Sequence, residues 1–331
     1  MNGHAVQTIG APRVATTLET VAWLGGYALL LLAIYVSGVK PIGISADLRN
    51  YELLYNASAI SDWWSIFQGS DFGYFGLAKL AAWLGWSFDL FAFVLAAVTC
   101  VLLYAVFTRI DTNRPLLVAI YASYLFWLHS YTQIRIVAAL AIGLFAIYVS
   151  RPAMRWPLLV LGILLHNSFI LLVFAYALVK VRRMEVLAAL AAVALFLLVG
   201  PLSSLVEGLV QRIITYQDLA SSTGQFAAIN LFSLMPLVQV VGIGCAVVHF
   251  RNLPTAAREE TFFSIVGVLA FYAASSVPVL AFRTFELFMP FFVILLSRLS
   301  QRSIFIWGVI LVWVLLGVRS SFLTPDSVVI L

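Results

Sequence analysis

The chain has 331 residues, of which 63% are hydrophobic and only 10% are charged, and its mean hydropathy is +1.05. Soluble domains carry about a quarter charged residues, so this composition excludes a soluble globular protein. It indicates a polytopic membrane protein in which residues 1–331 form one transmembrane domain. The net charge of +5 comes mostly from loop arginines and not from a basic tail, which excludes a nucleic-acid-binding segment. Cys100 and Cys245 fall in apolar runs and are expected to be small core residues.

Apolar runs suited to membrane helices recur along the chain. The first run, from about residue 21, is long for a signal-peptide core and lacks a clear cleavage site, so we expect it to be retained as a helix. A membrane span needs roughly 20 apolar residues. The runs lie at about 20–39, 87–108, 115–131, 134–150, 156–179, 185–200, 227–250, 261–281, 284–298 and 304–322.

The run 156–179 is interrupted in its middle by the polar tripeptide His166-Asn167-Ser168. If it crosses once, more of the lysines and arginines fall outside than inside. If it enters and returns as a hairpin of two half-helices, 12 of the 19 fall inside and 7 outside, as the positive-inside rule requires. We therefore predict a re-entrant hairpin, with a tilted single helix as the alternative. The resulting topology has about nine full spans plus the hairpin, or 10–11 helical segments, with the N-terminus inside and the C-terminus outside.

Two segments are predicted to lie outside the membrane, 40–86 and 201–226. The first contains an amphipathic helix over Asp47–Tyr55, an aromatic pair at Trp63-Trp64 typical of a bilayer surface, and a second helix with Asp71 in its N-cap position. The part from about residue 74 to 86 is apolar but short, which predicts a re-entrant or interfacial piece.

Two arginines stand at the outer ends of separate apolar runs, Arg135 and Arg283. Together with Arg49 they suit an anionic ligand, because arginine contacts phosphate oxygens in bidentate fashion and stays charged when desolvated. A lipid-linked diphosphate has its charged group at this depth. Each arginine alone is also explained as an interfacial anchor.

His166 is also explained as a hydrogen-bonded core residue. As a functional group it would be a general base, because histidine titrates near neutral pH; Asp47 is the alternative base. Glu286 lies three residues after Arg283 and is expected to pair with it. His4, His129 and His249 are scattered and show no ligand spacing with His166. Phosphate-loop, zinc and serine-nucleophile motifs are missing from the sequence, so we expect no metal and no cofactor.

Several short pieces resemble the EpsG-like, Wzy-type polysaccharide polymerases of bacterial inner membranes, and they occur in that family's order over about 45–300. The chain departs from the family at two places. Family members often carry an acidic-Pro-Gly-Phe piece where this chain has Asp71-Phe72-Gly73-Tyr74, and they often carry proline after the histidine, where this chain has Asn167. The matching pieces are Asp47 to Tyr55, Asp71 to Leu80, Gln133-Ile134-Arg135 with Leu140-Ala141, Leu165-His166-Asn167-Ser168, and Arg283 with the span from Phe288 to Leu296.

The resemblance implies an all-α, GT-C-like helical bundle in the inner membrane with its active site facing the periplasm. It implies a glycosyltransferase that moves a growing glycan from undecaprenyl diphosphate to a new lipid-linked repeat unit. Arg135 and Arg283 would hold the diphosphate, and His166 or Asp47 would take the acceptor proton. The groups that would position the substrate are Arg49, Asn50, Tyr51, Tyr55, Tyr74, Gln133 and Asn167.

The implied partners are undecaprenyl diphosphate-linked oligosaccharides, the lipid bilayer and a chain-length regulator. Three other readings stay open. A transferase of the O-antigen ligase type differs only in its acceptor. A transporter or flippase would distribute charges through the membrane and show repeat symmetry, and a scaffold would leave Arg135 and Arg283 without a role.

Overall fold

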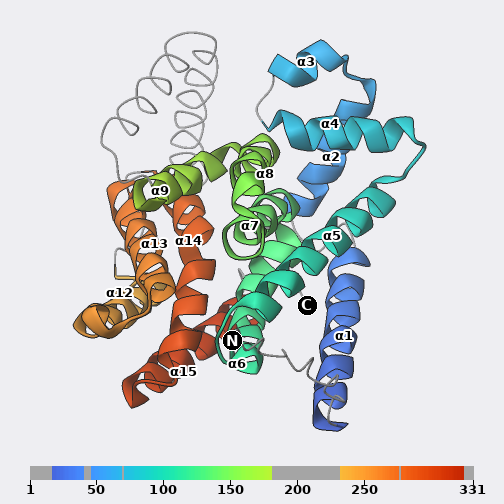
Figure 1. Cartoon of the computed structure of the whole chain (residues 1–331). Helices are drawn as coiled ribbons and strands as arrows, with labels where there is room; N and C mark the ends of the chain where they lie inside the picture. The colour runs from blue at the N-terminus through green and yellow to red at the C-terminus, as the bar shows by residue number, and fades with distance from the viewer. Residues whose placement is uncertain (1–16, 41–45, 69–70, 181–231, 276, 324–331) are drawn as a thin grey trace, which may run out of the picture.

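The structure is a computed structural model that describes residues 17–40, 46–68, 71–180, 232–275 and 277–323 (Figure 1). Every regular element in these ranges is helical, as the sequence predicts. The predicted apolar run 185–200 and outer segment 201–226 lie outside the described residues. The α-helices are α1 (Thr17–Gly38), α2 (Ala46–Ile60), α3 (Trp63–Gln68), α4 (Phe72–Trp83), α5 (Phe88–Arg109), α6 (Arg114–Ser123), α7 (Ile134–Tyr148), α8 (Pro152–Leu165), α9 (Ile170–Lys180), α12 (Leu234–Val248), α13 (Thr255–Ala273), α14 (Pro278–Leu299) and α15 (Ile304–Val318), and the shorter turns are η2 (Phe126–Thr132), η3 (Asn167–Phe169), η4 (Phe250–Asn252) and η5 (Arg319–Leu323).

Three helical segments of the described chain are long and apolar enough to cross a membrane: Phe88–Arg109, Leu280–Leu299 and Ile304–Leu323. A fourth candidate is the bent pair formed by η2 and α7. Four shorter apolar helices, each of 10–17 residues, add to the bundle: Leu24–Gly38, Pro152–Leu165, Asn167–Lys180 and Leu234–Val248. The part of the chain that the structure describes therefore has three to four candidate spans, fewer than the nine predicted.

The predicted run 115–131 is not one continuous helix. α6 ends at Ser123, and Tyr124 departs from helical geometry with φ −144° and ψ −58°. The chain then forms the π-helix η2, and Gln133 separates η2 from α7 at a bend of 113°. This seven-residue π-helix contains no glycine or proline that would have announced the break. π-Helical turns are frequent at functional sites.

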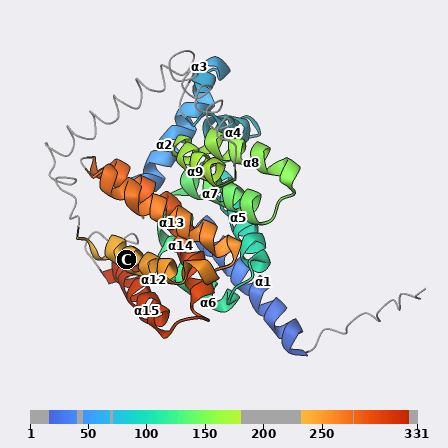
Figure 2. The same cartoon turned by 60° about the vertical axis from the view of Figure 1, so that its left-hand side comes forward.

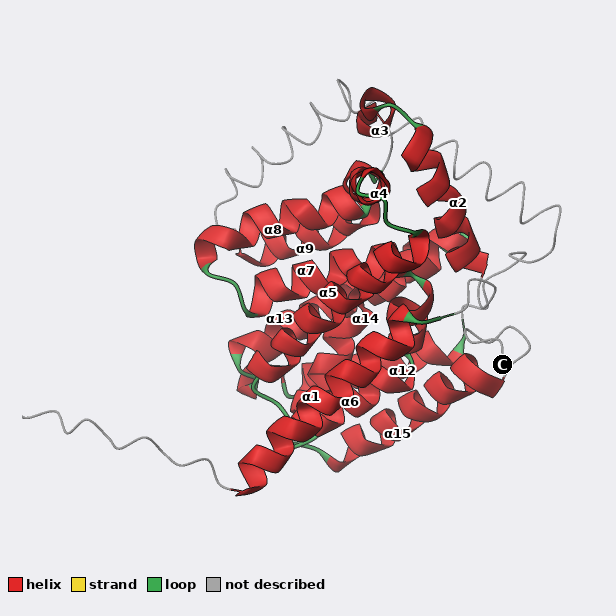
Figure 3. Ribbon diagram, turned by 90° about the vertical axis from the view of Figure 1, so that its right-hand side faces the viewer, coloured by secondary structure: helices red, strands yellow, loops and turns green. Residues whose placement is uncertain are grey.

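The hairpin predicted at 156–179 is present as a chain reversal. α8 ends at Leu165, His166 is extended, and the tip continues as η3 and α9. The rings of Trp156 and Tyr176 lie 5.7 Å apart, although 20 positions separate them in the sequence, so α8 and α9 run back along each other (Figure 3). Phe169 at the tip is fully buried, and a methyl group added at Gly143 or Gly162 would overlap its ring.

α4 approaches α8 closely at a single glycine. A Cβ at Gly73 would lie 2.8 Å from the backbone carbonyl carbon and oxygen of Leu164. Only glycine allows this approach, which brings the start of α4 beside the tip of the hairpin. α2 packs on α4 from the other side through the buried rings of Tyr51 and Tyr74, whose centroids are 6.1 Å apart. The predicted amphipathic helix thus exists, and α3 and α4 lie at one edge of the molecule (Figure 1).

α14 carries polar clusters near both of its ends, and α13 lies beside it (Figure 2). At its C-terminal end, Arg298 Nε donates to both carboxylate oxygens of Glu260 on α13, at 3.0 and 2.9 Å. The Tyr148 hydroxyl at the end of α7 donates to the same carboxylate at 3.1 Å. α7 and α14 therefore have their C-terminal ends together, and Arg135 and Arg283 stand near the opposite ends of these two helices.

Candidate active site

Asp71 is the residue on which the site is built. It is the N-cap residue of α4, but its side chain does not cap that helix, and its backbone is left-handed at φ 57° and ψ 34°. The carboxylate instead turns toward the hairpin tip, where Oδ1 accepts the backbone N–H of Asn167 at 2.7 Å. The Asn167 side-chain oxygen accepts the Asp71 N–H at 3.3 Å. This reciprocal pair fastens the start of α4 to the tip of the hairpin.

Arg135, in the first turn of α7, reaches the same carboxylate. Its Nη1 donates to Asp71 Oδ2 at 2.9 Å. The guanidinium also lies over two tyrosine rings, with its Cζ 5.0 Å from the centroid of Tyr51 and 5.6 Å from that of Tyr74. The ring faces and the carboxylate hold the guanidinium in one orientation, and about a fifth of the side chain stays exposed.

His166 completes this first cluster. Its Nδ1 lies 3.7 Å from Asp71 Oδ2, and 17% of its side chain is exposed. Burial alone would raise the pKa of the Asp71 carboxyl, but the neighbouring His166, Arg135 and the Asn167 N–H together hold that pKa below its ordinary value. Asp71 is therefore a permanent carboxylate near neutral pH. At this distance His166 Nδ1 makes no hydrogen bond among the described residues, so the carboxylate attracts the ring electrostatically and leaves Nε2 for proton transfer.

Arg283 is the centre of a second cluster. Its Nη2 lies 3.4 Å from Asp47 Oδ2 on α2, and its Nη1 lies 3.7 Å from Glu286 Oε2 on its own helix. Gln133, at the bend between η2 and α7, donates from Nε2 to Glu286 Oε2 at 3.3 Å. One third of the Arg283 side chain is exposed, so the guanidinium keeps a free side despite two carboxylates.

The two clusters are neighbours. Gln133 and Arg135 are two residues apart at the start of α7, and Asp47 and Tyr51 are one turn apart on α2. Tyr51 lies within electrostatic reach of both Arg135 and Arg283. The site therefore draws its groups from α2, α4, the bend before α7, the hairpin tip and α14, which are far apart in the sequence.

Comparison with protein families agrees with this arrangement. The family model described as EpsG matches residues 25–327 of the chain, which covers every element that contributes to the two clusters. The chain belongs to the EpsG family. No curated protein and no solved structure matches it. The family, together with the apolar helices, indicates a membrane protein of polysaccharide biosynthesis with a glycosyltransferase-like polymerase function.

The remaining candidate residues in this EpsG-family chain have different surroundings. Tyr55 donates its hydroxyl to the Trp86 carbonyl oxygen at 2.7 Å and packs against Phe88 and Phe91, so it holds α2 against α5. Tyr74 is fully buried and contacts Arg135 with its ring. Arg49 and Asn50 are exposed on α2, and the structure gives them no contact with either cluster.

Three functional candidates were not found from the sequence. From the sequence, Asp71 is placed at a helix N-cap and at the start of a family-like piece but is given no role in the site, and Glu286 is treated only as a partner for Arg283. His129 was set aside as isolated, yet in η2 it is completely buried, and neither ring nitrogen has a hydrogen-bond partner among the described residues. The charge of Arg283 reaches it. The sequence signal that could have pointed to His129 is its position six residues before Arg135.

The arrangement can bind an anion and move a proton. Arg135 and Arg283 are both partly exposed and lie within electrostatic reach of Tyr51. His166 shares the Asp71 carboxylate with Arg135. Arg135 stands in the first turn of α7, where the helix dipole also favours negative charge. No group of three or more potential metal ligands occurs in the described ranges.

Proposed function

We propose that this EpsG-family protein polymerises polysaccharide repeat units carried on a lipid diphosphate. A glycan linked to undecaprenyl diphosphate is the donor, and the non-reducing-end sugar of a second lipid-linked repeat unit is the acceptor. The observation that carries this proposal is the meeting of Arg135, Asp71 and His166 in one cluster, beside the Arg283 cluster. Such a constellation suits a reaction in which a diphosphate leaves and a hydroxyl attacks.

The proposed reaction is a single displacement at the anomeric carbon of the donor. The acceptor hydroxyl oxygen forms a bond to the anomeric carbon of the donor glycan, and the bond from that carbon to the diphosphate oxygen breaks with its electron pair. The hydroxyl proton passes to His166, and undecaprenyl diphosphate leaves. This step requires no oxidant and no cofactor.

The arginines have their role in the transition state of this reaction. As the bond to the diphosphate breaks, negative charge builds on the leaving oxygen, and Arg135 and Arg283 stabilise it with donors that are already in position. Pre-organisation is supported by the carboxylates of Asp71 and Asp47, which hold the two guanidinium groups. Fixed arginines supply the positive charge that other transferases take from a metal ion.

His166 is the favoured base over Asp47. Asp47 already accepts a hydrogen bond from Arg283, whereas the ring of His166 faces Asp71 with Nδ1 and is free to present Nε2 to a hydroxyl. Asp71 and Asn167 act as positioning residues, because they fix the hairpin tip on which His166 stands. Tyr51 lies under the Arg135 guanidinium and Gln133 bonds to Glu286, and both are buried, so we assign them the positioning of the two arginine clusters.

The proposed setting is the bacterial inner membrane, with the site on the periplasmic face. The N-terminus would be cytoplasmic and the C-terminus periplasmic, with α8 and α9 forming a re-entrant hairpin. The hairpin is supported by the Trp156–Tyr176 contact. The orientation is supported by the distribution of lysine and arginine, because Arg135, Arg283 and His166 share the side with fewer cations.

Elongation by the purified protein tests the proposed function. The protein is incubated with lipid diphosphate-linked repeat units, with and without EDTA, and the products are separated by size. The proposal predicts a ladder of longer glycans that EDTA does not remove. A single transfer to a different lipid acceptor with no ladder would favour a ligase. Movement of labelled lipid across a vesicle membrane without any new glycosidic bond would favour a flippase.

A further inference from the structure

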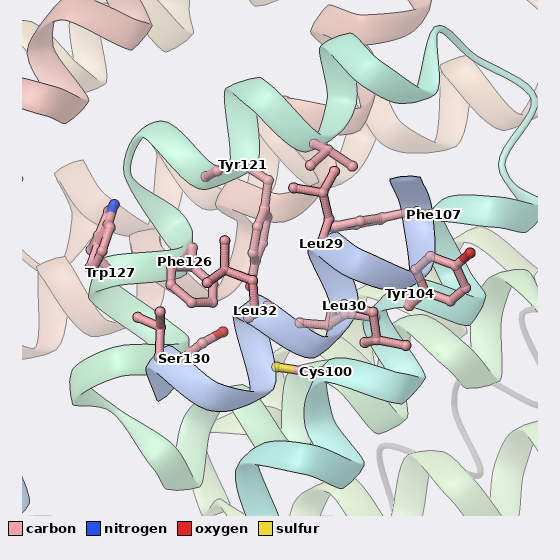
Figure 4. Close-up of a pocket in the computed structure, with 16 residues that line it drawn as sticks. Leu29, Leu30, Leu32, Cys100, Tyr104, Phe107, Tyr121, Phe126, Trp127 and Ser130 are labelled. Carbon is pink, nitrogen blue, oxygen red and sulfur yellow. The ribbon is translucent and has the colours of Figure 1, made fainter. Parts of the chain in front are cut away.

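A groove runs between α1 and the helices that lead to the site. Its volume is about 340 Å³, and α1, α5, α6 and η2 form its walls. Figure 4 shows Leu29, Leu30 and Leu32 of α1 facing the aromatic rings of the other helices. Leu29 and Leu32 are 57% and 56% exposed, so the groove opens on the outer surface of the bundle. We call it the α1 groove.

The α1 groove is directed toward the candidate active site. Its lining residues on α1 run from Gly26 to Val36, a rise of about 15 Å along a helix. One turn beyond Val36 lies Lys40, whose Nζ donates to the carbonyl oxygens of Ser130 at 3.3 Å and Tyr131 at 2.6 Å. Those carbonyls belong to the end of η2, immediately before Gln133 and the first turn of α7. Ser130 itself lines the groove.

Lys40 is a buried basic group just beyond the end of the α1 groove. Only 9% of Lys40 is exposed, and it forms no ion pair with a carboxylate among the described residues. Burial lowers the pKa of Lys40 to about 7, so its surroundings stabilise the ammonium form poorly. A buried cation that lacks a counter-ion favours an anionic ligand.

An apolar groove with a buried basic group just beyond its end matches a lipid with an anionic headgroup. The walls carry the rings of Tyr104, Phe107, Tyr121, Phe126 and Trp127. A groove of about 340 Å³ lined by these rings has room for part of a methyl-branched, unsaturated chain, which is thicker than a straight acyl chain. The same π-helix, η2, forms one wall and then leads to Gln133, so a chain in the groove would have its headgroup near the arginines.

We infer that the α1 groove holds the isoprenoid chain of the lipid diphosphate substrate, with Lys40 at the headgroup end. This inference rests on the proposed function. In this arrangement the isoprenoid chain enters the groove sideways from the bilayer, next to α1. It also makes the length of the lipid, and not only its diphosphate, a determinant of binding.

A groove-filling variant tests the inference. Ala33 lines the groove, so Ala33→Trp would occupy the space that the chain needs. Leu31, two positions earlier, is 67% exposed and does not line it, so Leu31→Trp is the matched control. KM is measured for donors with an eleven-isoprene chain and with a two-isoprene chain. Ala33→Trp should raise KM for the long chain by about tenfold, the effect of losing the burial of about two methylene groups, and leave KM for the short chain unchanged. Equal KM changes for both chains, or none, would overturn the inference.

A second measurement covers the case in which Ala33→Trp fails to fold. A photoreactive benzoyl-phenylalanine is placed at Leu30 in the groove or at Leu31 outside it, in vesicles of phosphatidylethanolamine and phosphatidylglycerol containing labelled undecaprenyl diphosphate. The inference predicts strong crosslinking of the isoprenoid from position 30 and little from position 31. Crosslinking of phospholipid from position 30 that the isoprenoid does not displace would overturn it. Because crosslinking needs no turnover, loss of elongation with intact crosslinking would count against the proposed function alone.

Discussion

Asp71 Oδ2 lies 3.7 Å from His166 Nδ1, and the two residues come from elements 95 positions apart in the sequence. The same oxygen accepts the Arg135 guanidinium at 2.9 Å. One carboxylate atom thus connects the proposed base with a proposed diphosphate ligand. Replacement of Asp71 should therefore affect both roles at once.

Asp71→Asn keeps the shape of the side chain and removes its charge. Arg135 would lose its counter-ion and His166 the group that orients its ring, so we expect the single-turnover rate of elongation to fall by about 10²- to 10⁴-fold. Asp62→Asn is the matched control, because Asp62 is exposed and its carboxylate bonds to the nearby Ser65. An Asp71→Asn enzyme with the wild-type rate would contradict the role given to this carboxylate.

The pH dependence of stability should follow the lowered pKa of Asp71. Because its folded-state pKa lies below its ordinary value of about 3.9, its contribution is fully present above that ordinary value and is lost as the pH falls through the folded-state pKa. The difference in Tm between wild type and Asp71→Asn should thus be constant from about pH 8 to pH 5 and shrink only in stronger acid. A difference that changes between pH 6 and 8 would contradict this prediction.

Arginine-to-lysine exchange separates charge from geometry. Arg135→Lys and Arg283→Lys keep a cation but lose the planar fork, and Arg135→Lys also loses the stacking on Tyr51 and Tyr74. If the arginines act on the leaving diphosphate, kcat should fall by about 10²- to 10³-fold, the range for one transition-state donor, with a smaller rise in KM. Arg151→Lys, at an exposed position before α8, should change neither constant. A pure KM effect would make the arginines binding groups only.

Gly73 should tolerate no side chain. In Gly73→Ala the new Cβ would meet the Leu164 backbone, so α4 must move away from the hairpin tip and carry Asp71 with it. We expect a loss of stability of about 1–3 kcal/mol and a fall in activity, although every polar residue of the site remains. Gly76→Ala, one turn later on the same helix, meets nothing closer than 3.8 Å and serves as the control. Equal behaviour of the two variants would show that the close approach is not required.

The sequence predicted the elements of the site better than their contacts. The polar tripeptide at His166 marked the hairpin because it interrupts an apolar run, and Arg135 and Arg283 were conspicuous because charges are rare at membrane depth. The role of Asp71 could not be predicted, because an aspartate before a helix ordinarily caps it. Only the left-handed backbone and the approach at Gly73 turn its side chain toward Asn167. The break at Tyr124 was also hidden, since a π-helix made of aromatic and apolar residues resembles an ordinary span.

His166 at the hairpin tip, Arg135 on α7 and Arg283 on α14 are proposed to form one catalytic site. A single-turnover assay tests this most directly. Purified wild type, Arg135→Ala, Arg283→Ala and His166→Ala are loaded with donor, mixed with acceptor, and followed for release of lipid diphosphate and formation of the longer glycan. Each variant should elute as a folded protein and lose at least about 10²-fold of both signals, while Arg151→Ala keeps them. Wild-type release and elongation in either arginine variant, or in His166→Ala, would contradict the claim that these three side chains form one catalytic site.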